Sequence, residues 1–333
     1  MHIRTAPGAS FEGEDPSGHL VFKVSMPSDE HGYFGRQCPS CHLVFRMNVD
    51  DYDALPEDLV LTCPYCGHEE GHGEFVTEQQ LNRAAKVAED AALQMVGDML
   101  DNAFGRLAHS TRHNKHVRVT YQSRPHFPEP LPGINEERLV RERQCSECGT
   151  RYAVFGEHRY CPVSGALPPR EVADDALAAE AAKLDALAEI TGAQRALLRE
   201  QGVFDRLYVD TLGRVVGIVE TFASGVFRAR VPEAEVLLKG RGNVFQRLDD
   251  TADLFAEHLG VDLRSAQDAD WSRLVTLWAA RHVHTHNGGT VDERYLRAVP
   301  HTRLKCGQRV VVTERDARSA IVLAAAFFGT IGR

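Results

Sequence analysis

Apolar residues recur at helical spacing through most of the second half of the chain. Positions three and four residues apart outline successive helices, and Gly288 with Gly289 predicts the end of the one that begins at Trp271. The expected helices span 203–226, 245–259, 271–287, 292–298 and 314–330. Connections of this length suit antiparallel neighbours, so residues 203–333 predict an antiparallel four-helix bundle.

The first half of the chain combines one long helical pattern with short strand-like runs. Residues 76–109 carry a helical apolar face, which we expect to pack in a core, and Thr77 followed by Gln80 forms a capping-box pattern at its start. Strand-like runs lie at 20–24, 44–47, 59–62 and 151–155. The predicted fold class is therefore mainly α, with small β modules and a long helix ahead of the bundle.

Changes in composition divide the chain into five segments. Pro125 to Pro132 is typical of a stiff connector, and Pro168-Pro169 marks a further boundary. The segments are 1–75 with a first cysteine module, 76–124 with the long helix and a basic strand, 125–170 with the connector and a second cysteine module, 171–202 as a linker helix, and 203–333 as the bundle. The Ala-rich linker helix suits a stalk or dimer contact, or a helix packed on its own domain.

Charge and composition narrow the classes of protein. The 333 residues carry a formal net charge of -9 and 43% hydrophobic residues, enough for each of two or three domains to bury a core. The acidic balance opposes general attraction to polyanions, so contact with nucleic acid must be local. Residues 1–20 hold no apolar run typical of a signal peptide, and the apolar stretch at 320–332 is too short to span a bilayer. We therefore expect a cytoplasmic protein with no membrane partner.

Two cysteine pairs near the amino terminus predict a zinc site. Cys38-x2-Cys41 and Cys63-x2-Cys66 are separated by 21 residues. Two tight turns of this kind present the four thiolates that tetrahedral zinc prefers, and the CPSC and CPYC sequences are similar to zinc-ribbon knuckles. Such a site is closed and therefore structural. The spacing leaves open whether the ribbon binds nucleic acid, binds protein or only holds a loop.

A second zinc site is expected further along the chain. Cys145-x2-Cys148 is followed by His158 and Cys161, a set of three thiolates and one imidazole. Six of the eight cysteines lie in Cys-x2-Cys pairs, which favours metal binding in a reducing compartment over disulfides. Cys306 lies apart from both groups, and we expect it to be a buried free thiol.

One basic region is a candidate surface for phosphate contacts. Residues 105–126 contain no acidic side chain. Its basic residues are Arg106, Arg112, Lys115, Arg118 and Arg124. In an acidic chain, such a cluster predicts a local nucleic-acid contact. The alternative is that these basic residues belong to a solvent-exposed helix end and strand that bind no phosphate.

The helix that begins at Trp271 ends in one arginine and three histidines. Arg281, the polar His282, three further residues and His286 are followed closely by Asn-Gly-Gly and Val291-Asp292. This arrangement resembles the Arg-polar-x3-His motif of the HEPN ribonuclease superfamily, with Arg281 and His286 at the two motif positions and His282 at the polar one. The resemblance covers 203–333 and does not extend to the cysteine modules.

The resemblance implies a four-helix bundle that pairs as a homodimer around a shared cleft and cleaves RNA without a metal. It also implies a toxin-antitoxin or antiviral setting, with an antitoxin or regulatory protein as a further partner. The residue types suit the chemistry: an imidazole can take and return protons near neutral pH, and a guanidinium can hold a phosphate. We assign acid/base chemistry to His286 and the phosphate to Arg281, while His282 orients the phosphate or shares the proton transfer.

Other interpretations of the histidine cluster remain open at the level of sequence. His282, His284 and His286 can form a metal site, although no nearby cysteine or suitably spaced carboxylate completes it. The bundle can also be a non-catalytic dimeric scaffold beside zinc ribbons that bind nucleic acid or protein, or a domain that binds a small ligand or a protein. The intact Arg281 and His286 favour an endoribonuclease that forms a 2′,3′-cyclic phosphate, with zinc modules that recognise the substrate or a partner.

Overall fold

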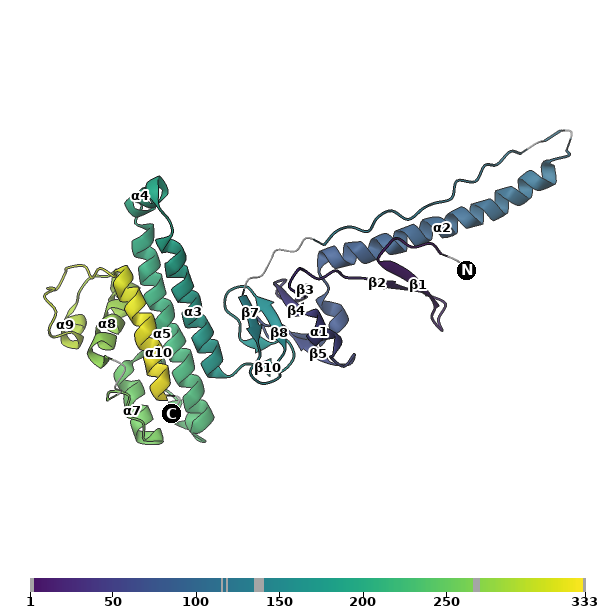
Figure 1. Ribbon diagram of the computed structural model, residues 1–333. Coiled ribbons are helices and arrows are strands. Elements are labelled where there is room, and N and C mark those ends of the chain that lie inside the picture. The colour runs from purple at the N-terminus through teal and green to yellow at the C-terminus, as the bar shows by residue number, and fades with distance from the viewer. Residues whose placement is uncertain (1–2, 115, 118, 135–140, 266–269, 332–333) are drawn as a thin grey trace. The chain divides into compact units, whose positions relative to one another are not determined.

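The computed structural model describes residues 3–114, 116–117, 119–134, 141–265 and 270–331 (Figure 1). The chain divides into two compact units. The amino-terminal unit comprises 1–155 and 160–165, and the carboxy-terminal unit comprises 156–159 and 166–333. Helices dominate the carboxy-terminal unit, and all the β-sheets lie in the amino-terminal unit or at its boundary, so the fold is mainly α as expected.

A four-stranded antiparallel sheet forms the centre of the amino-terminal unit. One hairpin consists of β3 (Tyr33–Gln37) and β4 (Val44–Asn48), and the other of β7 (Arg141–Gln144) and β8 (Arg151–Val154). The strand order is β3-β4-β8-β7, and Met47 pairs with Tyr152 where the hairpins meet. The two cysteine modules, expected in separate segments at 1–75 and 125–170, therefore share one sheet.

The contacts around β4 and β8 explain why the hairpins join. The side chains of Phe45, Met47 and Tyr152 are completely buried, so each hairpin supplies apolar area that the other covers. Asp51 lies in the short helix α1 (Val49–Asp53) and accepts hydrogen bonds from the backbone N of Arg151 at 2.7 Å and from its Nε at 3.0 Å. The hydrogen bonds from Arg151 outweigh the effect of burial and lower the pKa of Asp51.

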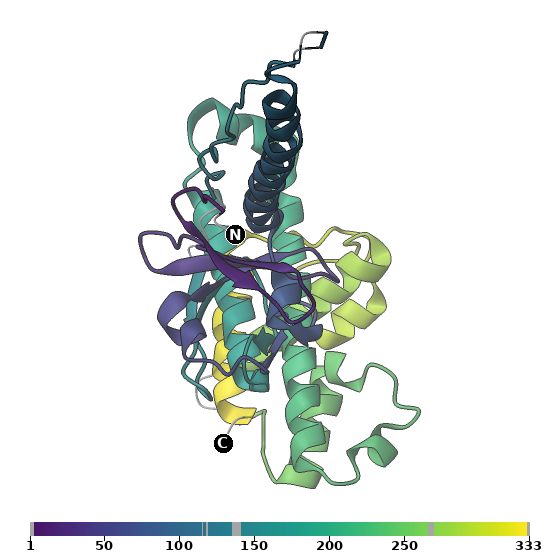
Figure 2. The ribbon, with the colours of Figure 1, turned by 90° about the vertical axis from the view of Figure 1, so that its right-hand side faces the viewer.

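Shorter elements surround this sheet. They are the hairpins β1 (Ala9–Glu14) with β2 (Leu20–Val24), β5 (Val60–Thr62) with β6 (Glu69–Gly71), and β9 (Tyr160–Cys161) with β10 (Gly165–Ala166), and a 3-10 helix at His72–Phe75. The expected strands at 20–24, 44–47, 59–62 and 151–155 are all present within one residue at each end. The β1–β2 hairpin contacts α2 through β2 (Figure 2).

The long helix α2 (Glu78–Thr111) confirms the expected helix, including the capping box between Thr77 and Gln80. Its expected role in a core is wrong for most of its length. Val87 and Ala91 are buried, but Leu81 is 57% exposed and Met99 is 64% exposed. The described residues of 112–124 contain no strand, so the expected basic strand is also wrong there.

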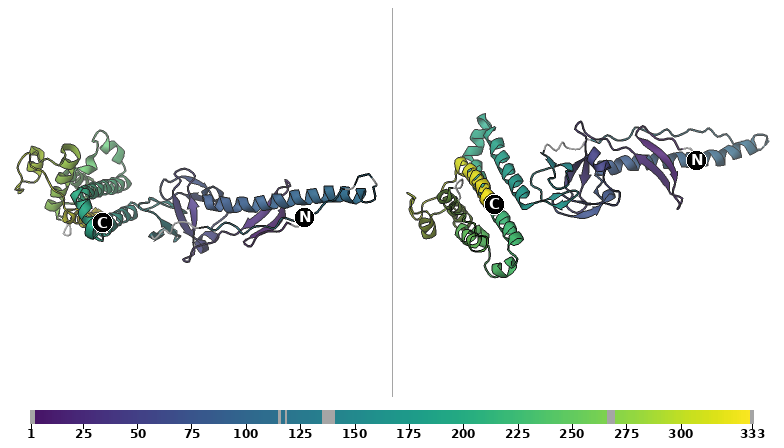
Figure 3. Two further views of the ribbon diagram at one scale, coloured as in Figure 1. Left: turned by 90° about the horizontal axis from the view of Figure 1, so that it is seen from above. Right: turned by 60° about the horizontal axis from the view of Figure 1, so that its bottom comes forward.

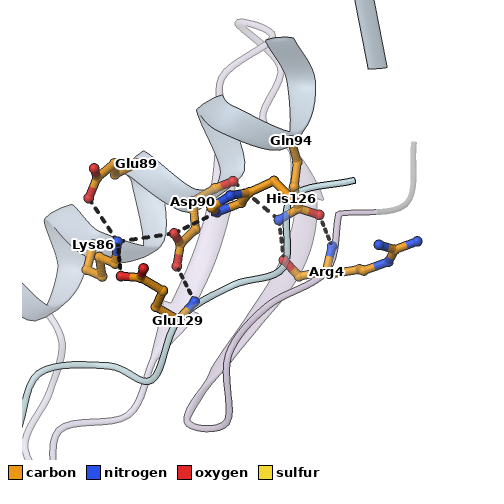
Figure 4. A network of polar contacts seen from close by, with 7 residues as sticks. All are labelled: Arg4, Lys86, Glu89, Asp90, Gln94, His126 and Glu129. Atoms are coloured by element: carbon orange, nitrogen blue, oxygen red, sulfur yellow. Dashed lines mark hydrogen bonds and ion pairs between the residues drawn. The ribbon is translucent and has the colours of Figure 1, made fainter. Parts of the chain in front are cut away.

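The chain returns along α2 as an extended segment (Figure 3). The buried carboxylate of Asp90 holds this segment, because its two oxygens accept from the His126 ring at 3.0 Å and from the backbone N of Glu129 at 3.2 Å (Figure 4). Lys86 lies 3.3 Å from the same carboxylate. Burial opposes ionisation of Asp90, but these partners outweigh it and lower its pKa.

A bundle of helices forms the carboxy-terminal unit. Helix α5 (Val203–Arg230) contacts α3 (Pro169–Ala188) and α10 (Glu314–Ile331) along its length, and it also contacts α8 (Trp271–Asn287) and α7 (Leu248–Leu259) (Figure 1). Shorter helices are α4 (Gly192–Glu200), α6 (Ala234–Leu238) and α9 (Glu293–Ala298), with a 3-10 turn at Val244–Gln246. The helices expected at 203–226, 271–287, 292–298 and 314–330 are confirmed, and the one expected at 245–259 begins at Leu248.

The segment expected as a linker helix at 171–202 belongs to the bundle. It contains two helices, and the first, α3, buries Ala173, Leu177 and Leu184 in the same apolar cluster as α5 and α10. This packing corresponds to the alternative that the sequence left open, a helix packed on its own domain, rather than to a stalk or dimer contact. The bundle therefore begins at Pro169 rather than at 203.

The apolar stretch at 320–332 lies mainly in α10. Ala320, Ala324 and Phe328 are completely buried, so this stretch supplies core area to the bundle. Among the described residues, no helix has both the length and the apolar character needed to span a membrane.

The packing of α3 generates a stability prediction. Leu184 is completely buried, so Leu184→Ala should lower the free energy of unfolding of the carboxy-terminal unit by about 2–5 kcal/mol. Both tryptophans of the chain, Trp271 and Trp278, lie in this unit, so denaturant unfolding followed by tryptophan fluorescence measures it selectively. The control is Leu197→Ala on α4, where the side chain is 53% exposed. Equal stability of the two variants would contradict the placement of α3 in the core.

Candidate catalytic pocket and metal centres

The sequence at the end of α8 sets the position of the arginine and histidine side chains. The helix begins with Asp270, whose side chain accepts from the backbone N of Arg273 at 2.9 Å. It ends at Gly288, which has a φ of 57° and donates its N–H to the carbonyl of Val283. At Gly289 a side chain is excluded, because a Cβ atom there would lie 2.7 Å from the His284 ring.

The backbone that follows α8 is fixed by a short antiparallel contact. Thr290 forms an isolated β-bridge with Arg309, and the N–H of Val291 donates to the carbonyl of Gln308 at 2.8 Å. Asp292 then caps α9 by accepting from the backbone N of Tyr295 at 2.8 Å. The turn after α8 is therefore held at both ends, and α9 lies beside the last turn of α8.

Arg281, His282 and His286 line one pocket of about 430 Å³. Arg294 on α9 and Arg247, which precedes α7, also line this pocket, together with the acidic residues Asp249 and Asp250, and Arg247 is ion-paired with Asp250. The structure thus brings together all three residues that the sequence singled out. Arg247 and Arg294 were missed, because no local motif connects them to α8.

The two pocket histidines lie next to each other, with ring centroids 4.7 Å apart. His282 is half-buried and His286 is exposed. Burial lowers the pKa of His282 below its usual 6.5, and the nearby cations Arg294 and His286 lower it further. His282 is therefore biased toward the neutral imidazole near neutral pH.

Two buried nitrogen atoms of the pocket residues have no hydrogen-bond partner in the described part of the chain. They are Nε of Arg281 and Nε1 of Trp278. Both nitrogens are buried in the wall of the pocket. The arginine side chains that line the pocket suit an anionic ligand that accepts hydrogen bonds.

His284 is separated from this pocket. Its Nε2 lies 3.0 Å from the carbonyl oxygen of Val310, and burial lowers its pKa. His284 therefore holds the helix end against the segment around Arg309. Within the described residues, no group of metal-ligating atoms includes His282, His284 or His286, so the alternative of a three-histidine metal site has no geometric support.

The first cysteine group has the geometry of a tetrahedral metal site. The Sγ atoms of Cys38, Cys41, Cys63 and Cys66 lie within 4.8 Å of one another, with Cys38 to Cys66 and Cys41 to Cys63 both at 3.7 Å. Tetrahedral zinc with Zn–S bonds of about 2.3 Å places its sulfur atoms about 3.8 Å apart. Burial raises the pKa of Cys63 and of Cys41, and a bound cation would favour the ionised form of these thiols.

The second cysteine group contains three of its four expected ligands. Cys145, Cys148 and Cys161 lie together, with the Sγ atoms of Cys148 and Cys161 3.5 Å apart. The group of ligand atoms does not include His158, whose Nδ1 lies 3.2 Å from Asp175. The hydroxyl of Ser164, which the sequence analysis missed, lies 3.3 Å from the Cys145 sulfur.

The thiols of the second group differ in how readily they ionise. Burial raises the pKa of Cys161 to about 12. Burial also opposes ionisation of Cys148, but hydrogen bonds with Thr150 and Cys161 outweigh it and lower the pKa of Cys148 to about 7. Cys306 is exposed, so the expectation that it is buried is wrong.

The predicted phosphate-contacting residues lie on the distal part of α2 and on the segment that returns along it. Arg106, Arg112 and Arg124 are exposed, whereas Lys115 and Arg118 lie outside the described residues. Arg124 lines a pocket of about 300 Å³ together with Asp98 and Asp101 of α2. Acidic side chains distant in sequence therefore border this basic region.

Comparison of the chain with protein-family models, with curated proteins and with solved structures gives no match in any of the three.

The metal centres generate a prediction about metal removal. A strong chelator should unfold the cysteine-bearing part of the amino-terminal unit, because binding energy at small zinc sites is largely folding energy. Tryptophan fluorescence should stay unchanged, because both tryptophans lie in the carboxy-terminal unit. Hydrogen exchange with and without chelator measures the first effect.

Cysteine variants provide the matched control for this experiment. Cys63→Ala should lower the zinc content, whereas Cys306→Ala, which lies outside both groups, should leave it unchanged. Loss of the tryptophan signal together with zinc would show that the two units do not unfold independently.

Proposed function

We propose that the protein is an endoribonuclease of HEPN type and that the pocket at the end of α8 is its catalytic site. The observation that carries the proposal is the convergence of Arg281, His282 and His286 in one pocket with two further arginines. These side chains supply proton transfer and phosphate binding, the two functions that cleavage of RNA by its own 2′-OH needs. The bundle around α5, α8 and α10 is then a version of the HEPN fold extended by α3.

The roles in the proposed reaction follow from the chemistry of each side chain. Neutral His282 accepts the proton of the 2′-OH, and the freed oxygen attacks the neighbouring phosphorus. The bond from phosphorus to the 5′ oxygen breaks, and His286 donates a proton to that leaving oxygen. Arg281 holds the non-bridging phosphate oxygens, where negative charge accumulates.

The products are a 2′,3′-cyclic phosphate and a 5′-OH, and no added metal is required because the nucleophile belongs to the RNA. DNA lacks the 2′-OH and is not cleaved. The zinc-binding modules and the exposed arginines Arg106, Arg112 and Arg124 recognise the substrate or a partner protein. The active form is a homodimer in which two pockets face a shared cleft, restrained in the cell by an antitoxin or regulatory protein.

Cleavage assays with pocket variants test this proposal. With an RNA pool and matched DNA in the absence of added divalent metal, the protein should cut only RNA. His286→Ala should lower the rate by about 10²–10⁴-fold, the usual contribution of a positioned general acid or base. Arg281→Ala should lower it by about 10²–10³-fold, and Arg281→Lys should not restore it because an ammonium lacks the planar pair of donors.

Two exposed residues outside the pocket serve as controls. His301→Ala and Arg297→Ala should keep full activity. Arg297 lies on α9 like the pocket residue Arg294, but it does not line the pocket. Product analysis should identify cyclic phosphate ends. Absence of RNA cleavage by a zinc-loaded, folded protein, or equal cleavage by His286→Ala, would favour instead a non-catalytic scaffold.

The lowered pKa of His282 predicts the pH dependence. A general base must be neutral, so the cleavage rate should persist below pH 6.5 and fall only as the pH passes through the lowered pKa of His282. In His282→Asn this acidic limb should disappear together with most of the rate. An acidic limb above pH 6.5 in the unmodified protein would contradict the assignment.

Folding must be followed in the same samples. Because the folded state lowers the pKa of His282, the unfolded state binds the proton more readily. The contribution of neutral His282 to the stability of the folded state is therefore complete above pH 6.5. This contribution is lost as the pH falls through the lowered pKa of His282. Tryptophan fluorescence at each pH separates loss of the base from loss of the fold.

A further inference from the structure

The amino-terminal unit contains an internal repeat built around its cysteines. In the first copy, β3, the Cys38–Cys41 turn and β4 are followed by the Cys63–Cys66 turn between β5 and β6. In the second copy, β7, the Cys145–Cys148 turn and β8 are followed by a turn that begins at Cys161 between β9 and β10. The two copies meet through the antiparallel pairing of β4 with β8.

The turns share their backbone conformation as well as their order. The fifth residue of each has a positive φ: 61° at His42, 73° at Gly67, 78° at Gly149 and 81° at Gly165. In three of the turns, the sulfur of the first cysteine accepts a hydrogen bond from the backbone N–H two residues later. The distance is 3.4 Å at Cys38, at Cys145 and at Cys161. The segment 161–165, with sequence CPVSG, is therefore a fourth turn of the same kind as CPYCG at 63–67.

This equivalence places Ser164 where the first copy has Cys66. The corresponding distances agree: Cys38 to Cys66 is 3.7 Å, and Cys145 to the Ser164 hydroxyl is 3.3 Å. The other pair also corresponds, with Cys41 to Cys63 at 3.7 Å and Cys148 to Cys161 at 3.5 Å.

We infer that the second group binds zinc through Cys145, Cys148, Cys161 and the hydroxyl oxygen of Ser164, as a weaker copy of the four-thiolate site. Zinc accepts sulfur and oxygen ligands in one tetrahedron, and bond lengths of about 2.3 and 2.1 Å place sulfur and oxygen about 3.6 Å apart. A serine hydroxyl is a harder and weaker donor than a thiolate. The two centres therefore differ in affinity, and zinc at the second centre exchanges more readily.

The difference in affinity has a structural consequence. Zinc at the second centre links the β7–β8 hairpin to the β9–β10 hairpin, while zinc at the first centre links β3–β4 to β5–β6. When free zinc falls, the second pair of hairpins separates first and the four-thiolate centre stays loaded. The amino-terminal unit thus responds to zinc in two steps.

Zinc release from the full-length protein to a chromophoric chelator tests the assignment of Ser164. The unmodified protein should hold two zinc ions per chain and release them in two phases. Removal of a group that only orients a zinc ligand costs about 10–100-fold in affinity, so a difference in ligand should separate the phases by at least roughly tenfold. Cys145→Ala should abolish the weaker phase and so identify it.

Three variants distinguish the candidate fourth ligands. Ser164→Cys should bring the weaker phase close to the stronger one, and Ser164→Ala should weaken it further. His158→Gln should change neither phase, because neither ring nitrogen of His158 belongs to the group of ligand atoms that lie together with the three sulfurs. Cobalt substitution adds a spectroscopic readout, since Ser164→Cys should raise the sulfur-to-cobalt charge-transfer absorption of the second centre by one thiolate.

The assignment is overturned by either of two results. Loss of the weaker phase in His158→Gln, with no effect of Ser164→Cys, would make His158 the fourth ligand. A single zinc ion per chain that Cys145→Ala leaves in place would show that the second group binds no metal. Both readouts are independent of ribonuclease activity.

Discussion

Four ionisable sulfur atoms held 3.7 Å apart at their closest pairs impose the main constraint on the amino-terminal unit. Burial alone keeps thiols such as Cys63 protonated, and four thiolates at these distances repel one another without a cation. A metal ion bound by these sulfurs would remove both difficulties and would make the turns fixed points from which the hairpins extend. Phe45, Met47 and Tyr152, which lie on the adjoining strands β4 and β8, are completely buried.

Backbone contacts around one helix end fix the candidate catalytic pocket. Two glycines end α8, and the bridge between Thr290 and Arg309 holds the turn that follows. The same turn directs the chain into α9, which carries Arg294 to the pocket. Burial at this helix end, together with the nearby Arg294, lowers the pKa of His282 and so links the local structure to the proposed proton transfer.

The sequence predicted features that depend on local spacing. Helical periodicity located α5, α8 and α10, and the capping box located the start of α2, because a helix satisfies its own backbone hydrogen bonds within a few residues. The repeated Cys-x2-Cys pairs identified the first metal group, and Arg281 with His286 identified one side of the pocket. The repeat of CPYCG as CPVSG was also readable, but a search for cysteines alone overlooks a serine at the fourth position.

Contacts between distant segments were decided only by the tertiary structure. The pairing of β4 with β8, the inclusion of α3 in the bundle and the arrival of Arg247 and Arg294 at the pocket join residues that no local pattern connects. The same holds for Asp90, whose carboxylate anchors a segment 36 residues away through His126. The physical reason is that periodicity reports which face of an element is apolar, while the identity of the covering element depends on how all such faces are buried together.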